Sequence, residues 1–163
     1  MKEQYREALQ RPNRPTIAGA RLIDHTVHVD SRGWLCEVMR RDDPHFGGFG
    51  QLSIVTNFAP RVIRAYHMHQ YQGEVFVVMD GAIQFIIVDE RAGSVTHQHL
   101  NGFVLMGERP QSLHVPCDVQ HGLMALTQSA RLLTVTTLPY DTGDPDEVRI
   151  PPDSYGDVWR VGW

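Results

Sequence analysis

The sequence predicts an all-β protein whose short strands form a barrel or sandwich. Turn-forming residues recur about every 8–12 positions, which is the spacing typical of that fold class. Several segments between the turns alternate polar and apolar side chains, as a strand with one buried face does. No sustained helical period is visible after residue 15.

The strands are expected where apolar, β-branched and aromatic residues are bounded by turns. The alternating segment 25–29 is separated from a second strand, 34–39, by the turn at 30–33 (DSRG), and 41–50 is a loop by composition. Asp80-Gly81 supplies a tight hairpin turn. The remaining strands are expected at 51–58, 61–69, 74–79, 82–89, 99–106, 112–116, 119–126 and 130–138. Residues 1–10 suit a short helix, which the prolines of 11–15 end.

Length and composition suggest one domain over residues 1–163, with an N-terminal extension at 1–15 and a docking tail at 140–163. The hydrophobic content of 42% and the charged content of 21% are ordinary for a globular chain. The tail is rich in Pro, Asp and Gly and carries Trp159 and Trp163. We expect it to cover an apolar surface, either on its own barrel or on a partner subunit.

Charge and hydropathy argue against several classes of partner. The net charge of −4 and the lack of a basic block argue against a nucleic-acid partner. The apolar runs fall far short of the roughly 18 residues that span a membrane, and residues 1–10 lack the apolar core of a signal peptide. With Cys36 and Cys117 interpreted as reduced thiols, these features predict a soluble, cytoplasmic protein.

A cluster of metal-ligand residues carries the clearest chemical signal. His67 and His69 are two positions apart on an expected strand, so both side chains point to one face. Glu74 begins the next strand, and a proline turn delivers His121 onto a later one. Three imidazoles and a carboxylate suit a divalent ion such as Zn, Fe, Mn, Ni or Co. We therefore expect a divalent metal ion as cofactor, with His67, His69, Glu74 and His121 as its ligands.

The other histidines give weaker signals. His97 and His99 form a second same-face pair without a carboxylate pattern, which favours solvent or an interface. His45 falls in a loop, and His114 could face either side of the barrel.

The two ligand segments also resemble a known pattern. Residues 67–81 read HxH-x4-E-x6-G and residues 116–121 read P-x-D-x-x-H, similar to the two metal motifs of the cupin superfamily. Asp118 stands where glycine is usual, and Ala125 where asparagine is often found. The resemblance implies a cupin double-stranded β-helix, that is, a jelly-roll barrel.

A narrower resemblance covers roughly residues 20–163. The segments 30–33 (DSRG), 62–67 (VIRAYH), 89–94 (DERAGS) and 120–122 (QHG) are similar to the dTDP-4-dehydrorhamnose 3,5-epimerase family. This resemblance implies a homodimer that acts on a 4-keto-6-deoxy sugar nucleotide. It makes His67 the base that removes a proton next to the ketone and puts His121 beside that ketone. The substrate-binding residues that it implies are Arg32 and Arg64 for the diphosphate, Glu37 and Gln51 near the nucleotide, and Tyr140.

The chain departs from this family at several catalytic positions. The family keeps lysine at the position of Glu74, tyrosine at that of Thr134, and glutamine or a similar residue at that of His69. Its carboxylate that orients the catalytic histidine falls beyond Trp163. The new ligands are similar to those in the zinc-bearing cupin domain of bifunctional capsule-sugar epimerase-reductases. That similarity implies that a cation replaces the lysine as enolate stabiliser and leaves Tyr71, Tyr66 or a metal-bound water as the base.

Three functions follow from these patterns. The leading hypothesis is a metal-dependent epimerase or isomerase of a sugar nucleotide. The second is a non-haem metal cupin that activates oxygen or isomerises a small carbonyl compound. The third is a catalytically inactive cupin that binds a sugar nucleotide.

Overall fold

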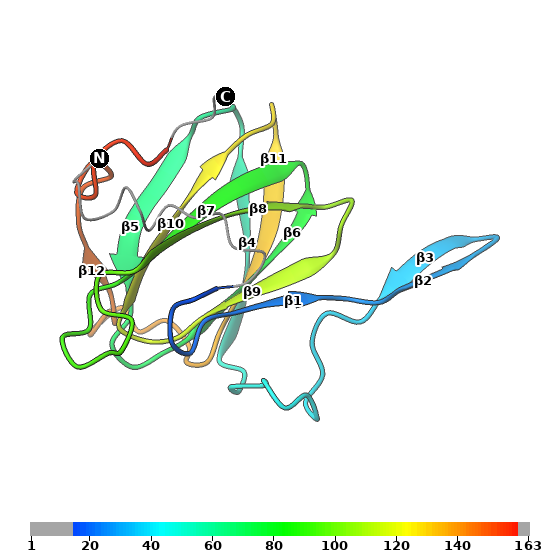
Figure 1. Cartoon of the computed structure of the whole chain (residues 1–163). Coiled ribbons are helices and arrows are strands. Elements are labelled where there is room, and N and C mark those ends of the chain that lie inside the picture. Colours follow the sequence, from blue (N-terminus) through cyan, green and yellow to red (C-terminus); the bar gives the residue numbers. More distant parts are fainter. Residues whose placement is uncertain (1–14, 160–163) are drawn as a thin grey trace.

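The computed structural model describes residues 15–159, which form two five-stranded antiparallel sheets and a separate hairpin (Figure 1). The first sheet has the order β1 (Arg21–Asp24), β9 (Gln111–Val115), β6 (Glu74–Asp80), β11 (Ala130–Thr136) and β4 (Gln51–Asn57). The second has the order β12 (Val148–Arg149), β5 (Ile63–Met68), β10 (Val119–Ala125), β7 (Ala82–Asp89) and β8 (Leu100–Met106). The hairpin pairs β2 (Val27–Asp30) with β3 (Gly33–Cys36). No helix occurs among these residues, and the helix expected at 1–10 lies outside them.

The two sheets form the walls of a jelly-roll barrel, as expected. Their facing side chains make one apolar core, because every second residue along each strand points inward. Phe76 from the first sheet and Phe85 from the second meet in this core, with ring centroids 5.3 Å apart. Ile83, Leu113 and Leu132 have no exposed surface. The core fills one part of the barrel and leaves another part free for polar groups.

Two short strands were missed by the sequence analysis. The β1 strand pairs with β9, about 90 positions away in the chain, and the two residues of β12 pair with Met68 and His67 at the end of β5. Neither segment is long enough to show a period of its own, so only distant partners define it as a strand. The segment expected at 25–29 begins as a strand only at Val27.

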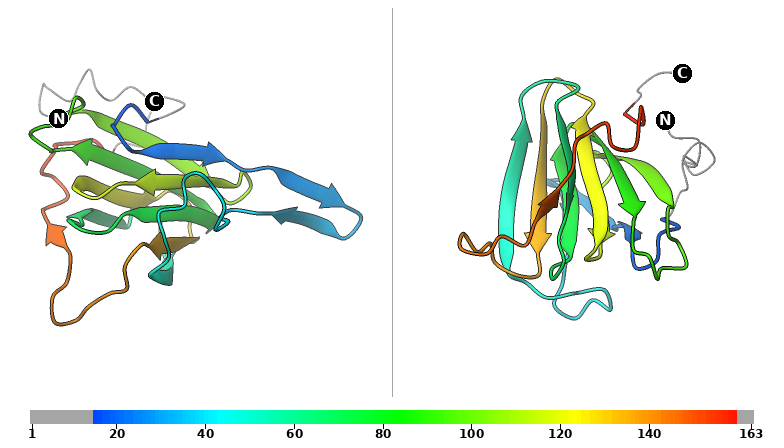
Figure 2. Two further views of the ribbon diagram at one scale, coloured as in Figure 1. Left: turned by 90° about the horizontal axis from the view of Figure 1, so that it is seen from below. Right: turned by 90° about the vertical axis from the view of Figure 1, so that its left-hand side faces the viewer.

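The described part of the tail packs on its own barrel, the first of the two alternatives. Ile150 and Tyr66 exchange two backbone hydrogen bonds, of 2.9 and 3.0 Å. The Tyr66 ring meets the rings of Tyr155 and Trp159 at centroid distances of 4.8 and 5.3 Å. These residues form a second apolar cluster on the outer face of the second sheet, along which the tail runs in Figure 2 (right). Trp163 lies outside the described residues.

The β2–β3 hairpin projects from the barrel (Figures 1 and 2, left). Its apolar side chains are exposed: Val29 by 76%, and Trp34 and Leu35 by 61% each. Exposed apolar residues gathered on one element are typical of an interaction surface. Across residues 15–159, no helix has the length and hydropathy to cross a membrane. Cys36 and Cys117 are both free.

Candidate functional site

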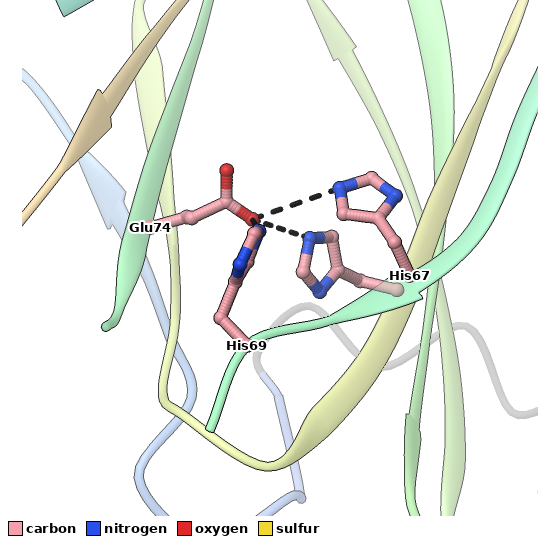
Figure 3. A group of neighbouring side chains, drawn as sticks. His67, His69 and Glu74 are labelled. Atoms are coloured by element: carbon pink, nitrogen blue, oxygen red, sulfur yellow. Dashed lines mark ion pairs between the residues drawn. The ribbon is translucent and has the colours of Figure 1, made fainter. Parts of the chain in front are cut away.

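Three strands and the loop that follows one of them bring the expected ligands together. His67 lies on β5, and His69 follows directly after its end. The β10 strand pairs with β5 so that His121 stands opposite His67. Glu74 opens β6 in the facing sheet. The three imidazoles therefore come from one wall of the barrel and its adjoining loop, and the carboxylate comes from the other wall. In Figure 3 the Glu74 carboxylate points toward the rings of His67 and His69.

The four side chains converge on a small volume inside the barrel. Glu74 Oε2 lies 3.7 Å from His67 Nε2, 3.4 Å from His69 Nε2 and 2.5 Å from His121 Nε2. One ligand atom from each residue falls within 4.8 Å of every other. Glu74 and His121 are almost fully buried, whereas the His67 side chain keeps 22% of its surface exposed. His67 is therefore the imidazole that a bound molecule reaches most easily.

Hydrogen bonds orient two of the rings. His121 Nδ1 donates to the carbonyl of Val119 at 3.0 Å, and His69 Nδ1 donates to the carbonyl of Asp146. With the proton on Nδ1, each ring turns the lone pair of Nε2 toward Glu74.

Two buried polar atoms at the centre lack a hydrogen-bond partner. Glu74 Oε2 and His121 Nε2 have none among the described residues, although they lie only 2.5 Å apart, because their approach is not aligned for an N–H···O bond. Two lone pairs this close repel each other unless a positive charge lies between them. Four ligands about 2.1 Å from a tetrahedral zinc ion would be about 3.4 Å apart. The separations of 3.4 and 3.7 Å are close to that value, whereas Glu74 and His121, at 2.5 Å, would have to move apart around an ion. The donor types suit a small divalent cation.

The electrostatics of the cluster keep Glu74 charged and His67 neutral. Burial raises the pKa of Glu74, but the neighbouring imidazoles, His121 first, outweigh it and hold this pKa well below its ordinary value. Burial is the main cause that lowers the pKa of His67 to about 3, and the neighbouring His121 adds to it. Burial also lowers the pKa of His69, but the contact with Glu74 outweighs it and raises that pKa overall. At neutral pH the site therefore presents an anionic oxygen beside neutral His67.

A cavity of about 620 Å³ opens onto this cluster and contains three of the expected substrate-binding residues, Gln51, Arg64 and Tyr140. Arg64 Nε donates to Asn57 Oδ1 at 3.0 Å and Nη2 to the carbonyl of Thr56 at 3.1 Å. The guanidinium is thus fixed against β4, which belongs to the other sheet. Gln51 Oε1 accepts a bond of 3.0 Å from the backbone N–H of Tyr140, which ties the start of the tail to the rim of the cavity.

The structure does not bring Arg32, Glu37 or Tyr71 to this cavity. Arg32 is at the tip of the projecting hairpin, where it pairs with Asp30 at 2.5 Å. Glu37 pairs with Arg40 at 3.3 Å and lines a different cavity. Tyr71 is 72% exposed. Within one chain, these three expected residues therefore lie away from the cluster and its cavity.

Tyr66 is also removed from the cluster. Its ring packs in the outer apolar cluster under the tail, and burial raises the pKa of its phenol. The two-residue period of a strand indicates this position, because Tyr66 and His67 are adjacent on one strand and point to opposite faces.

Three residues of the tail were missed. Asp146, Glu147 and Arg149 line the cavity, and Arg149 pairs with Glu147 at 2.7 Å. No local pattern marks them, because the segment is placed at the cavity by contacts of Asp146, Val148 and Arg149 with residues 67–72, more than 70 positions away.

A second cavity, of about 550 Å³, contains His25, His45 and His114. Ser112 Oγ lies 2.9 Å from His25 Nε2 and 3.0 Å from His114 Nε2. Burial lowers the pKa of His114 to about 4. His97 and His99 are exposed, in agreement with their expected surface role.

Known proteins match both the sequence and the fold. The chain is 35% identical over 142 residues to the probable low-salt glycan biosynthesis epimerase Agl13 of Haloferax volcanii, covering 85% of this chain and 90% of that protein. It is 31% identical over 138 residues to the spore coat polysaccharide biosynthesis protein SpsL of Bacillus subtilis, covering 84% and 91%.

Solved structures share the jelly-roll fold. A dTDP sugar isomerase from Desulfovibrio desulfuricans has a TM-score of 0.77 at 26% identity, covering 85% of this chain and 88% of that one. The dTDP-4-dehydrorhamnose 3,5-epimerase of Bacillus anthracis, solved with TDP and PPi bound, has a TM-score of 0.82 at 22% identity, covering 93% and 90%. Residues 14–159 match the family described as dTDP-4-dehydrorhamnose 3,5-epimerase. With this match and the relative at 35% identity, the chain belongs to the dTDP-4-dehydrorhamnose 3,5-epimerase family.

Proposed function

We propose that this protein is a metal-dependent epimerase or isomerase of a 4-keto-6-deoxy sugar nucleotide. One observation carries the proposal: a cluster of three imidazoles and a buried carboxylate lies at a cavity that also holds a fixed arginine. The cluster is suited to a cation and the arginine to a phosphate. A cavity of about 620 Å³ also falls within the usual range for small-molecule sites.

His67, His69, Glu74 and His121 would hold the cation. The lone pairs at the centre support this assignment, because Glu74 Oε2 is buried and has no hydrogen-bond partner among the described residues. A bound divalent ion, such as Zn, Fe, Mn, Ni or Co, would act as a Lewis acid that stabilises negative charge on the ketone oxygen. Glu74 supplies the negative charge that attracts it.

Arg64 would bind the diphosphate of the substrate. Two hydrogen bonds already hold its guanidinium in place, so little side-chain entropy is lost when an anion binds. Gln51 and Tyr140, which line the same cavity, would contact the nucleotide and the sugar. A relative of the same fold was solved with TDP and PPi bound, which supports a nucleotide ligand here.

Epimerisation takes a proton from the carbon next to the ketone and returns a proton to the opposite face of that carbon. His67 is the exposed imidazole of the cluster and is neutral at pH 7, so it can accept a proton. The same ring also belongs to the cation site. Metal content separates these two tasks: if His67→Asn keeps its metal but loses proton exchange, His67 is the base. If it loses the metal, His67 is a ligand.

The protein would act as a homodimer joined through its hairpins. The exposed Val29, Trp34 and Leu35 favour burial against a second copy, and Arg32 at the hairpin tip would then reach the partner's cavity. Size-exclusion chromatography with light scattering checks this. Leu35→Glu should elute as a monomer, and a wild-type monomer at micromolar concentration would contradict the proposal.

Three measurements test the function. Metal analysis of untagged protein should find close to one divalent ion per chain. Exchange of deuterium from solvent into C3 or C5 of a 4-keto-6-deoxy sugar nucleotide should be fast with the metal and should stop with a chelator. The nucleotide alone should raise the melting temperature. Metal without nucleotide stabilisation would favour the small-carbonyl or oxygen chemistry, and nucleotide stabilisation without exchange would favour an inactive binding protein.

A further inference from the structure

We propose that Asp146, in the tail, is a positioning residue that sets the geometry of the cation site. The inference rests on the proposed function in taking His69 as a ligand. Asp146 follows Pro145 and comes two residues before β12, so it belongs to the tail, which the sequence predicted to cover an apolar surface. Its contacts are to the loop that carries His69 and leads to Glu74.

The Asp146 carboxylate holds this loop by its backbone. Oδ1 accepts the N–H of Gln70 at 2.7 Å, and Oδ2 accepts those of Tyr71 and Gln72 at 2.9 and 3.1 Å. Three successive backbone N–H groups converging on one carboxylate form a strong, charge-assisted cap. Because the loop runs from one ligand to the next, this cap fixes the distance between His69 and Glu74.

The backbone of Asp146 acts on the ligand itself. Its carbonyl accepts the Nδ1–H of His69, and this bond selects the tautomer whose Nε2 lone pair points at Glu74. One residue thus contacts four successive residues, 69–72, and couples loop shape to ring orientation.

The strand that follows anchors Asp146 in turn. Val148 and Arg149 pair with Met68 and His67, so the tail is bonded to β5 directly before the loop. These pairs hold the backbone of Asp146 beside β5, and the side-chain cap holds the loop that carries His69 against the Asp146 carbonyl, so both are needed for the bond to Nδ1. Losing the side-chain cap would loosen the loop and leave the β12 pairing intact.

The test compares Asp146→Ala, Asp146→Asn and a matched control, Asp144→Ala. Asp144 is exposed, lies two positions away and changes the charge by the same amount. Asp146→Ala should weaken zinc binding about 10- to 100-fold, the range seen for residues that orient a ligand. Asp146→Asn keeps one acceptor oxygen and should fall between. The control should bind zinc as the wild type does, measured by competition with a zinc dye.

A second readout does not depend on metal. Imidazole ¹⁵N spectra of metal-free protein at pH 8 should show His69 as the Nδ1–H tautomer in the wild type and as a mixture in Asp146→Ala. Circular dichroism must show each variant folded. An unchanged tautomer in folded Asp146→Ala, or zinc affinity equal to wild type, would overturn the assignment. If the wild type binds no divalent ion, the metal part of the proposed function fails, while the tautomer measurement still decides the role of Asp146.

Discussion

Replacing Glu74 by Gln removes the only negative charge in the four-residue cluster and keeps the size of the side chain. A divalent ion and a carboxylate about 2.1 Å apart attract each other by about 4 kcal/mol even at the dielectric constant of water. Glu74 is 6% exposed, so the true dielectric is lower and the attraction is larger. Because about 1.4 kcal/mol corresponds to tenfold in affinity, we expect Glu74→Gln to bind zinc about a thousand-fold more weakly.

The assay is competition with a chromophoric zinc chelator at pH 7.5, with circular dichroism to confirm folding. Glu147→Gln is the control, because Glu147 lines the same cavity but pairs with Arg149 outside the cluster. It should change zinc affinity less than threefold. A folded Glu74→Gln protein that binds zinc as tightly as the wild type would refute the cation site. Equal losses in the two variants would show that only the general charge of the cavity matters.

Three further predictions concern binding and stability. Arg64→Ala should abolish most of the rise in melting temperature that dTDP causes, whereas the control Arg131→Ala, at an exposed arginine, should keep it. Equal rises in the two variants would exclude Arg64 as the residue that binds phosphate. Gly122→Ala should cost about 1–3 kcal/mol, because its Cβ would lie 2.9 Å from Ala65 Cα, and an unchanged melting temperature would contradict this. Burial lowers the pKa of His114 to about 4 in the folded protein. As pH falls from 6.5 to 4, His114 is protonated in the unfolded chain but not in the folded one, so the folded protein loses stability over this range. In urea titrations, the free energy of unfolding should fall between pH 7 and pH 4.5 by about 1–2 kcal/mol less in His114→Gln than in the wild type. An equal fall in the two proteins would refute the prediction.

Local rules predicted most of the strands and the central pair of histidines. The two-residue spacing of His67 and His69 places their side chains on one side of the chain, and this holds in the structure although the strand ends at Met68. The same rule excludes Tyr66 from the site. Residue type and the expected turns also pointed to Glu74 and His121, but their positions along the chain carry no information about their distance in space.

Contacts between distant segments could not be predicted in this way. The strand β12, the cap from Asp146 and the packing of Trp159 on Tyr66 all join residues more than 70 positions apart. The residues of the projecting hairpin have the pattern of ordinary strands, and nothing in their sequence indicates that the hairpin projects from the barrel.

The sequence by itself determined the all-β class, the turns and the same-face pair His67 and His69, because each depends on residue type and on spacing of a few positions. Only the tertiary structure decided that a carboxylate from one sheet meets three imidazoles from the opposite side, and that the tail holds the loop between them. Those arrangements depend on strand register and sheet packing, which are set by the burial of the whole core and not by any one segment.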